Sequence, residues 1–156
     1  MDIIKISLLI IGALLIVLIG VFINNKYKKK YEIIQQIIYI TYQIEIDILF
    51  SKKNIFEIIK PLLVNLDSEL QTVLLNYIDT NIMNFELLTE NENQEINNYF
   101  NSLGECSADI EISKTTSFKE RMQLTKDKYK QLLFKNGQLA FKLSVCASLV
   151  FIIMFA

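Results

Sequence analysis

The stretch that decides the fold is Ile6–Ile23, which reads ISLLIIGALLIVLIGVFI and contains no charged residue. As an α-helix, its eighteen residues would be about 27 Å long, close to the roughly 30 Å hydrocarbon core of a bilayer. A lysine cluster follows at once: Lys26, Lys28, Lys29 and Lys30. We therefore predict a membrane anchor over residues 1–25, with these lysines as its basic membrane flank.

A cleaved signal peptide is the alternative for this segment. The apolar run is long for the hydrophobic region of such a peptide, and Phe22–Asn25 lacks the small residues of a cleavage site. The lysine cluster also resembles the flank of a stop-transfer segment. We therefore expect the anchor to be retained.

A second uncharged stretch, Leu143–Ala156, reads LSVCASLVFIIMFA. Its fourteen residues would rise only about 21 Å as a helix, a length that also suits a buried core helix. Starting at Leu139 lengthens it to eighteen residues, and Lys142 can extend its ammonium to the headgroups. We predict a C-terminal anchor over residues 139–156, continuous with the helix before it, and keep a buried helix as the alternative.

The placement of lysines predicts how the chain is oriented in the membrane. Lysines precede the second anchor as they follow the first, and Lys142 completes the membrane flank, whereas the outer ends carry only Lys5. Basic residues concentrate on the cytoplasmic side of membrane helices. The positive-inside rule therefore places residues 26–138 in the cytoplasm, as one helical domain, and both termini outside.

Composition favours an all-α fold, because the chain has only four glycines and one proline. Tyr31–Phe50 is ambiguous: alternate positions from Ile40 to Ile48 are apolar, as in a strand, yet isoleucines also recur at helical spacing from Ile33. No turn residues bound a strand there, so we predict a helix that is buried on two sides. The expected class is a membrane protein with N- and C-terminal transmembrane helices flanking a helical bundle.

Helix-start signals divide the middle of the chain. Asn54 is suited to cap a short helix, and both Ser68–Gln71 and Thr89–Glu92 have the form of a capping box. Gly104 is suited to a left-handed C-cap of the helix that Thr89–Glu92 opens. From Ser107 onwards a single helix of up to 50 residues is expected, with Gly137 either a hinge or a simple cost of about 1 kcal/mol.

The residues for catalysis are sparse. The chain has no histidine, no Gly-rich phosphate loop and no cysteine cluster, and its two cysteines, Cys106 and Cys146, lie in different predicted domains. Glu45 and Asp47 are two positions apart, so on a helix they point to different faces. We predict no enzyme, no cofactor and no metal. The lysines beside Tyr27 and Tyr31 are expected to meet lipid rather than nucleic acid.

Two further sets of residues are candidates for contacts: small residues in the anchors for helix packing, and acidic residues in the middle domain for partner docking. Gly12, Gly20, Ser144 and Ser148 are small residues that would let another helix approach closely. Positions that face lipid are an equally good explanation for them. The stretch 61–113 has ten acids and no basic residue, which favours either solubility or docking of a basic partner. The candidate docking residues are Glu86, Glu90, Glu92 and Glu95.

The chain resembles stage III sporulation protein AB of endospore-forming bacteria in this order of anchor, basic flank, helical domain and anchor. Glu45-Ile46 and Leu103-Gly104 match that family's Glu-Ile in the first cytoplasmic helix and its Leu-Gly helix stop. Departures are Leu143-Ser144 in place of a second Leu-Gly, Lys52-Lys53 in place of Pro-Leu, and Ser107, Asp109 and Glu111 where the family tends to have Asp and Gln.

The resemblance implies a helical domain similar to those of type II secretion platform proteins. It implies a structural role in the complex that links mother cell and forespore, in the mother-cell membrane, with other subunits and a cytoplasmic ATPase as partners. Homo-oligomers are compatible with it. The alternative function is a small transport protein whose copies form a pore.

Overall fold

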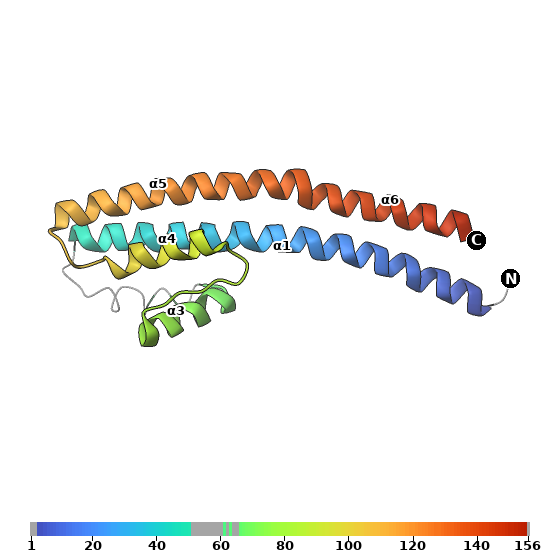
Figure 1. Cartoon of the computed structure of the whole chain (residues 1–156), viewed down its shortest axis with the longest axis horizontal. Coiled ribbons are helices and arrows are strands. Elements are labelled where there is room, and N and C mark those ends of the chain that lie inside the picture. The colour runs from blue at the N-terminus through green and yellow to red at the C-terminus, as the bar shows by residue number, and fades with distance from the viewer. Residues whose placement is uncertain (1–2, 51–60, 62, 64–65, 156) are drawn as a thin grey trace. The chain divides into compact units, whose positions relative to one another are not determined.

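The structure, a computed structural model, describes residues 3–50, 61, 63 and 66–155. Regular structure in these ranges is helical and includes no strand, so the predicted all-α class is confirmed (Figure 1). The predicted short helix from Asn54 lies outside the described residues. The elements are α1 Ile3–Phe50, α3 Ser68–Thr80, α4 Glu90–Asn101, α5 Ala108–Leu132, the π-helical η2 Leu133–Gly137 and α6 Gln138–Phe155.

The chain forms two compact units, and α1 contributes to both. The hairpin unit consists of Met1–Tyr31 and Asp127–Ala156, and the bundle unit is Glu32–Lys126. The bundle unit lies within the predicted middle domain, 26–138.

Among the described residues, two helical stretches are long and apolar enough to cross a membrane. They are Ser7–Ile48 in α1 and the uninterrupted Ala108–Phe155. Few residues are buried in the most apolar eighteen-residue part of each stretch, unlike in a core helix of a soluble protein. Exposed examples are Leu8, Ile11, Leu15, Leu18 and Phe22 on α1, and Leu143, Leu149, Val150, Ile153 and Met154 on α6.

Within the hairpin unit, α1 runs antiparallel to the C-terminal helix, because contact positions rise along one as they fall along the other. A Cβ atom added at Gly12 would lie 2.8 Å from Phe151 Cε1, and one at Gly20 would lie 2.6 Å from Ser144 Cβ. Real Cβ atoms do not come this close to other atoms. Gly12, Gly20 and Ser144 therefore lie between two helices of the same chain, and Ser148 is also buried.

The final helix is continuous from α5 through η2 to α6, as the absence of proline predicts. Its irregularity is the π-helical turn η2, which the sequence did not indicate. Gly137 ends this turn, and an added Cβ would lie 2.9 Å from Asn24 Oδ1 on α1. The glycine therefore serves close approach of two helices, which neither the hinge nor the simple-cost interpretation included.

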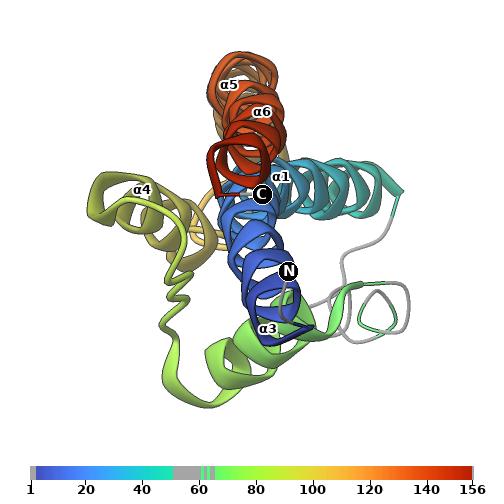
Figure 2. The same cartoon turned by 90° about the vertical axis from the view of Figure 1, so that its right-hand side faces the viewer.

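Parts of α1 and α5, together with α3 and α4 (Figure 2), contribute buried side chains to the core of the bundle unit. In α1, isoleucines at helical spacing are buried, which confirms the helix in Tyr31–Phe50 and excludes the strand alternative; they are Ile33, Ile34, Ile37, Ile40 and Ile44. Aromatic rings join α4 to its neighbours: Tyr99 stacks on Phe118 of α5 at 3.9 Å, and Phe100 meets Tyr77 of α3 edge to face at 5.9 Å.

The two predicted capping boxes have different outcomes. Thr89 and Glu92 form a complete box at the start of α4, with the Glu92 side chain accepting from the Thr89 backbone N–H at 2.9 Å. At α3 the prediction is wrong, since Asp67 is the N-cap and makes no side-chain capping bond. The Asp67 carboxylate instead accepts a 2.8 Å hydrogen bond from Gln36 Nε2, which ties α3 to α1.

The predicted C-cap of α4 is partly correct. Gly104 is left-handed, with φ of 87°, but it follows the actual C-cap, Ser102, by two residues. Ser102 has right-handed geometry, and its N–H donates to Asn98 O at 3.2 Å. The left-handed C-cap occurs at α3 instead, where Asn81 has φ of 56° and donates to Tyr77 O.

Candidate functional site: a polar groove between α4 and α5

A groove of about 830 Å³ lies between α4 and α5 in the bundle unit. Its α4 wall consists of polar side chains that recur on one helix face at spacings of three and four residues. Its α5 wall carries serines, an exposed Ile110 and two cations. The lining residues are Asn91, Gln94, Glu95, Asn98, Tyr99, Ser102, Asp109, Ile110, Ser113, Lys114, Ser117 and Arg121.

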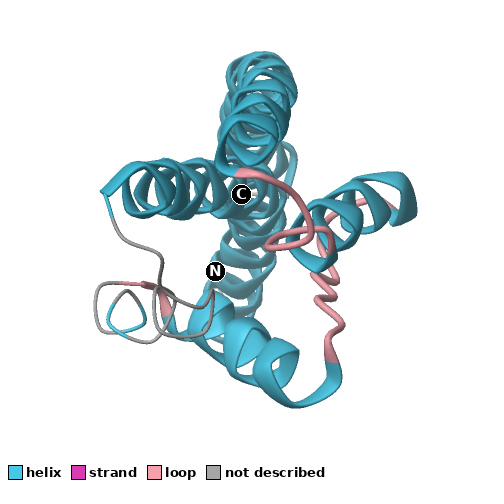
Figure 3. Ribbon diagram, turned by 90° about the vertical axis from the view of Figure 1, so that its left-hand side faces the viewer, coloured by secondary structure: helices cyan, strands magenta, loops and turns pink. Residues whose placement is uncertain are grey.

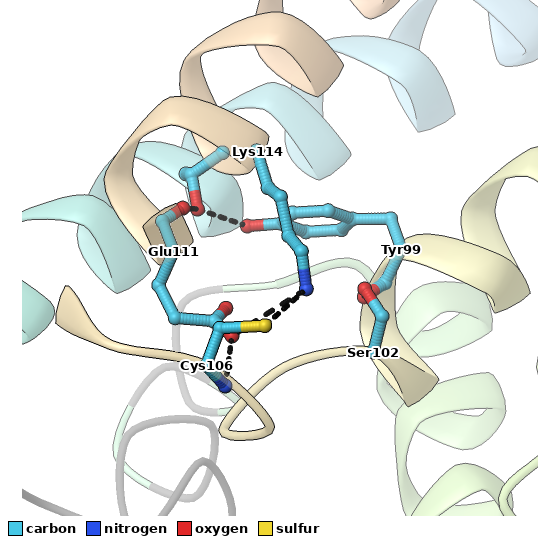
Figure 4. A network of polar contacts seen from close by, with 6 residues as sticks. Tyr99, Ser102, Cys106, Glu111 and Lys114 are labelled. Carbon is cyan, nitrogen blue, oxygen red and sulfur yellow. Dashed lines mark hydrogen bonds and ion pairs between the residues drawn. The ribbon is translucent and has the colours of Figure 1, made fainter. Parts of the chain in front are cut away.

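Tyr99 joins this groove to the core. Its ring is 5% exposed, and its hydroxyl donates to Thr115 Oγ1 at 3.2 Å (Figure 4). Thr115 in turn donates to the Glu111 backbone carbonyl at 2.7 Å. Burial disfavours the charged phenolate and raises the pKa of Tyr99 above its ordinary value. The hydroxyl therefore stays a neutral donor that joins α4 to α5.

A second set of polar contacts lies at the start of α5 (Figure 4). Glu111 is 4% exposed, and its Oε1 accepts a 3.1 Å bond from the Cys106 N–H. Lys114 Nζ donates to Cys106 Sγ at 3.2 Å and lies 3.7 Å from Glu111 Oε1. The bond to Cys106 raises the pKa of the Lys114 ammonium. These contacts fix the turn that leads from α4 into α5.

The four candidate docking acids do not form one exposed cluster. Glu86 and Glu90 are exposed. Glu92 is 8% exposed and is occupied in the capping box, so it is not available to a partner. Glu95 reaches the groove, where it forms an ion pair with Arg121 of α5. Glu92 does not suit docking, because its buried carboxylate accepts the Thr89 backbone N–H, and docking by the other three acids stays a prediction.

Two asparagines on α4 hold the loop between α3 and α4, one of the segments drawn in pink in Figure 3. Asn97 accepts from Met83 N–H and donates to Met83 O, both at 2.7 Å. Asn93 makes the same two bonds with Phe85, at 2.9 and 3.0 Å. Sequence reasoning did not identify this clamp. The available signal was the spacing of Asn93 and Asn97, one turn apart on a helix.

Glu45 links two helices of the bundle unit. Its carboxylate accepts a 3.1 Å hydrogen bond from Thr116 Oγ1 and forms an ion pair with Lys119, both on α5. Its side chain is only 16% exposed. The prediction that it does not converge with Asp47 on a substrate stays a prediction, but Glu45 has a clear structural role.

The predicted membrane-flank lysines lie in the hairpin unit. Lys26, Lys28, Lys29 and Lys142 are exposed, and Lys30 is half-buried. In the described part of the chain, no group of three or more Cys, Asp or Glu side chains converges to hold a metal ion.

The groove is suited to binding polar groups of a partner. Its amides and hydroxyls supply donors and acceptors without adding net charge, and both of its cations are already engaged by neighbouring side chains. Protein–protein interfaces contain scattered hydrogen bonds of this kind between polar groups, set in a surface that is partly apolar. Comparisons with protein-family models, curated proteins and solved structures found no match to this chain.

Proposed function

We propose that this protein is a non-enzymatic, membrane-anchored component of a multi-protein assembly, in which the hairpin unit holds the bundle unit at a bilayer. The observation that carries the proposal is the division of charge. Residues 1–31 and 127–156 contain nine lysines and two acids, a net charge of +7. Residues 32–126 contain seven basic and fifteen acidic residues, a net charge of −8.

This division supports a membrane role because anionic headgroups attract the basic unit and repel the acidic one. The lysines cluster at one end of the apolar run in α1, at Lys26–Lys30, which favours that end on the cytoplasmic side. The bundle unit is then cytoplasmic, where its acidic surface meets soluble or membrane-bound partners.

Anchoring is favoured over pore formation by the side chains of α6. Its exposed positions are almost all apolar, with Lys142 at the start as the charged exception. A water-filled pore needs polar side chains along an outward face of such a helix. The small residues Gly20 and Ser144 face each other within one chain, so they favour an intramolecular pair of anchors.

The resemblance to the stage III sporulation AB family gives this role a specific setting. We propose that the protein serves as a platform in the mother-cell membrane that faces the forespore and contacts other subunits of that complex, among them a cytoplasmic ATPase. Deleting the gene in its host and scoring heat-resistant spores by stage tests this setting. Arrest after engulfment, rescued by the intact gene, is expected; normal sporulation would remove the sporulation role and leave only the anchored bundle.

A separate experiment tests on which side of the membrane the bundle unit lies. Both cysteines are exposed, so a Cys146→Ala variant leaves Cys106 as the only thiol to label. In intact spheroplasts, a membrane-impermeant maleimide is expected to leave Cys106 unlabelled until the membrane is opened. Labelling from outside would reverse the orientation and exclude a cytoplasmic partner.

A further inference from the structure

Two nucleophilic side chains, Cys106 and Lys114, are in contact where the turn after α4 leads into α5. Lys114 Nζ donates a hydrogen bond to Cys106 Sγ at 3.2 Å (Figure 4). Cys106 is exposed and the Lys114 side chain is 34% exposed, so reagents in solution reach both groups. Any group that becomes bonded to the sulfur therefore lies beside the amine nitrogen of Lys114.

The carboxylate of Glu111 is directed at this pair (Figure 4). Glu111 is 4% exposed, and its Oε1 accepts from the Cys106 N–H at 3.1 Å and lies 3.7 Å from Lys114 Nζ. Its Oε2 is also buried and accepts no hydrogen bond from the described part of the chain. A buried carboxylate with an unused oxygen beside an ammonium is suited to accept the proton that the nitrogen must lose before it acts as a nucleophile.

These three groups are suited to passing an acyl group from sulfur to nitrogen. In the first step, the Cys106 thiolate attacks the carbonyl carbon of an acyl thioester, a C–S bond forms, and the carrier leaves as a thiolate. In the second step, the neutral Lys114 amine attacks the same carbon, a C–N bond forms, and Cys106 leaves as a thiolate. The nitrogen loses two protons in total through Glu111, one of which goes to the carrier thiolate and the other to water.

The order of the two steps follows from the contact between the sulfur and the ammonium. The hydrogen bond to Cys106 raises the pKa of Lys114. Acylation removes the negative charge from the sulfur, so this cause is lost and the ammonium gives up its proton more readily. The amine is then held against the thioester, which replaces a slow encounter between two molecules by a reaction within one.

We propose that Cys106 and Lys114 form a self-acylation site, in which Cys106 takes an acyl group from a small-molecule thioester and passes it to the Lys114 nitrogen. This site is independent of the proposed membrane role. Acylation removes the charge of Lys114, which is one of the two cations of the groove between α4 and α5, and with it the ion pair with Glu111. The modification therefore makes the groove more acidic.

The test incubates the full chain, purified in a neutral detergent, with acetyl-coenzyme A, and follows acetylation of each lysine by peptide mass spectrometry. Lys126 is the internal reference, because it lies on the same helix and is half-buried like Lys114. The site variant is Cys106→Ser, which removes the thiol at an exposed position. The matched control is Cys146→Ala, which removes the other exposed thiol of the chain.

In the wild type and the control, Lys114 is expected to be acetylated about 10-fold faster than Lys126, because its nitrogen is held beside the loaded sulfur. In Cys106→Ser, the rate at Lys114 is expected to fall to that of Lys126. Lys114→Arg keeps the positive charge but removes the amine that receives the acyl group. In this variant the acetyl group is expected to stay on Cys106 as a thioester, which neutral hydroxylamine removes.

Three results would overturn the proposal. Equal acetylation of Lys114 in the wild type and in Cys106→Ser would show direct attack by the amine, and equal rates at Lys114 and Lys126 would show no special site. Absence of a thioester on Cys106 in Lys114→Arg would exclude the first step. If Cys106→Ser does not fold, blocking Cys106 of the Cys146→Ala variant with a methylthio group, and releasing it with dithiothreitol, supplies the same comparison.

Discussion

The hairpin unit and the bundle unit are both helical, but they are held together in different ways. In the hairpin unit, glycines let backbones approach and most apolar side chains stay exposed. In the bundle unit, aromatic and isoleucine side chains are buried and asparagines bind an irregular loop. The proposed bilayer environment of the hairpin unit accounts for this difference, because lipid gives helices no hydrophobic reason to associate, whereas water favours the burial of large apolar groups.

Because buried side chains hold the bundle unit together, truncating one of them is expected to lower its free energy of unfolding more than any other substitution below. Phe118 has no exposed surface and touches both Tyr99 and Phe100. Phe118→Ala is expected to lower the free energy of unfolding of the bundle unit by about 3–5 kcal/mol, because it removes a buried ring and leaves a cavity. Urea unfolding of the detergent-solubilised chain, followed by circular dichroism, measures this change.

Leu124→Ala is the matched control, because Leu124 lies on the same helix and is 71% exposed. It is expected to change the free energy of unfolding by no more than about 0.5 kcal/mol. Similar effects of the two substitutions would contradict an aromatic core centred on α4 and α5.

The asparagine clamp predicts the next largest effect. Asn97→Ala removes three hydrogen bonds, two of them to Met83, and leaves backbone groups of Met83 without this partner. The expected loss is about 2–3 kcal/mol in the free energy of unfolding. Asn98→Ala, at an exposed neighbouring position, is expected to have little effect in the same urea experiment. Equal effects would mean that the amide matters only for helix propensity.

Local patterns predicted much of the fold, because the interactions they report are local. Isoleucine spacing predicted the helix in Tyr31–Phe50, and Thr89 with Glu92 predicted the start of α4. The apolar runs predicted both candidate membrane helices by length and composition. In each of these cases, residues three or four positions apart lie on one helix face, so the sequence itself contains the relevant distances.

Contacts between helices, including those that form the groove, depend on distances that sequence spacing does not contain. Glu92 has the same local signature as a capping residue and as a surface acid, and only its burial separates the two. Glu45 meets Lys119 across 74 positions in the chain, and Gly137 meets Asn24. Such pairs are fixed by how helices approach, so a single sequence gives no sign of the partner.

In the hairpin unit, adding atoms is expected to be harmful. Gly20→Ala places a methyl group 2.6 Å from Ser144 Cβ and 3.1 Å from Ala140 O, so the helices must separate. The expected cost is about 1–3 kcal/mol, measured as a lower melting temperature in detergent. Ser144→Gly removes the nearest atoms and is expected to recover much of this loss in the double variant. No recovery would show that the two residues do not face each other.

The smallest expected effect is a dependence on pH that belongs to the bundle unit. Burial raises the pKa of Tyr99 above its ordinary 10.0, so the folded state keeps a proton that the unfolded chain loses. Stability from this group is therefore complete below pH 10 and is lost as pH rises above it, by at most about 1.4 kcal/mol per pH unit. Tyr99→Phe is expected to reduce the loss of stability between pH 9 and pH 11, although it also removes the bond to Thr115 at both values. Tyr39→Phe, which removes a hydroxyl from an exposed ring, is the matched control. An unchanged loss in Tyr99→Phe would show that the phenol joining the groove to the core ionises as readily in the folded chain as in the unfolded one.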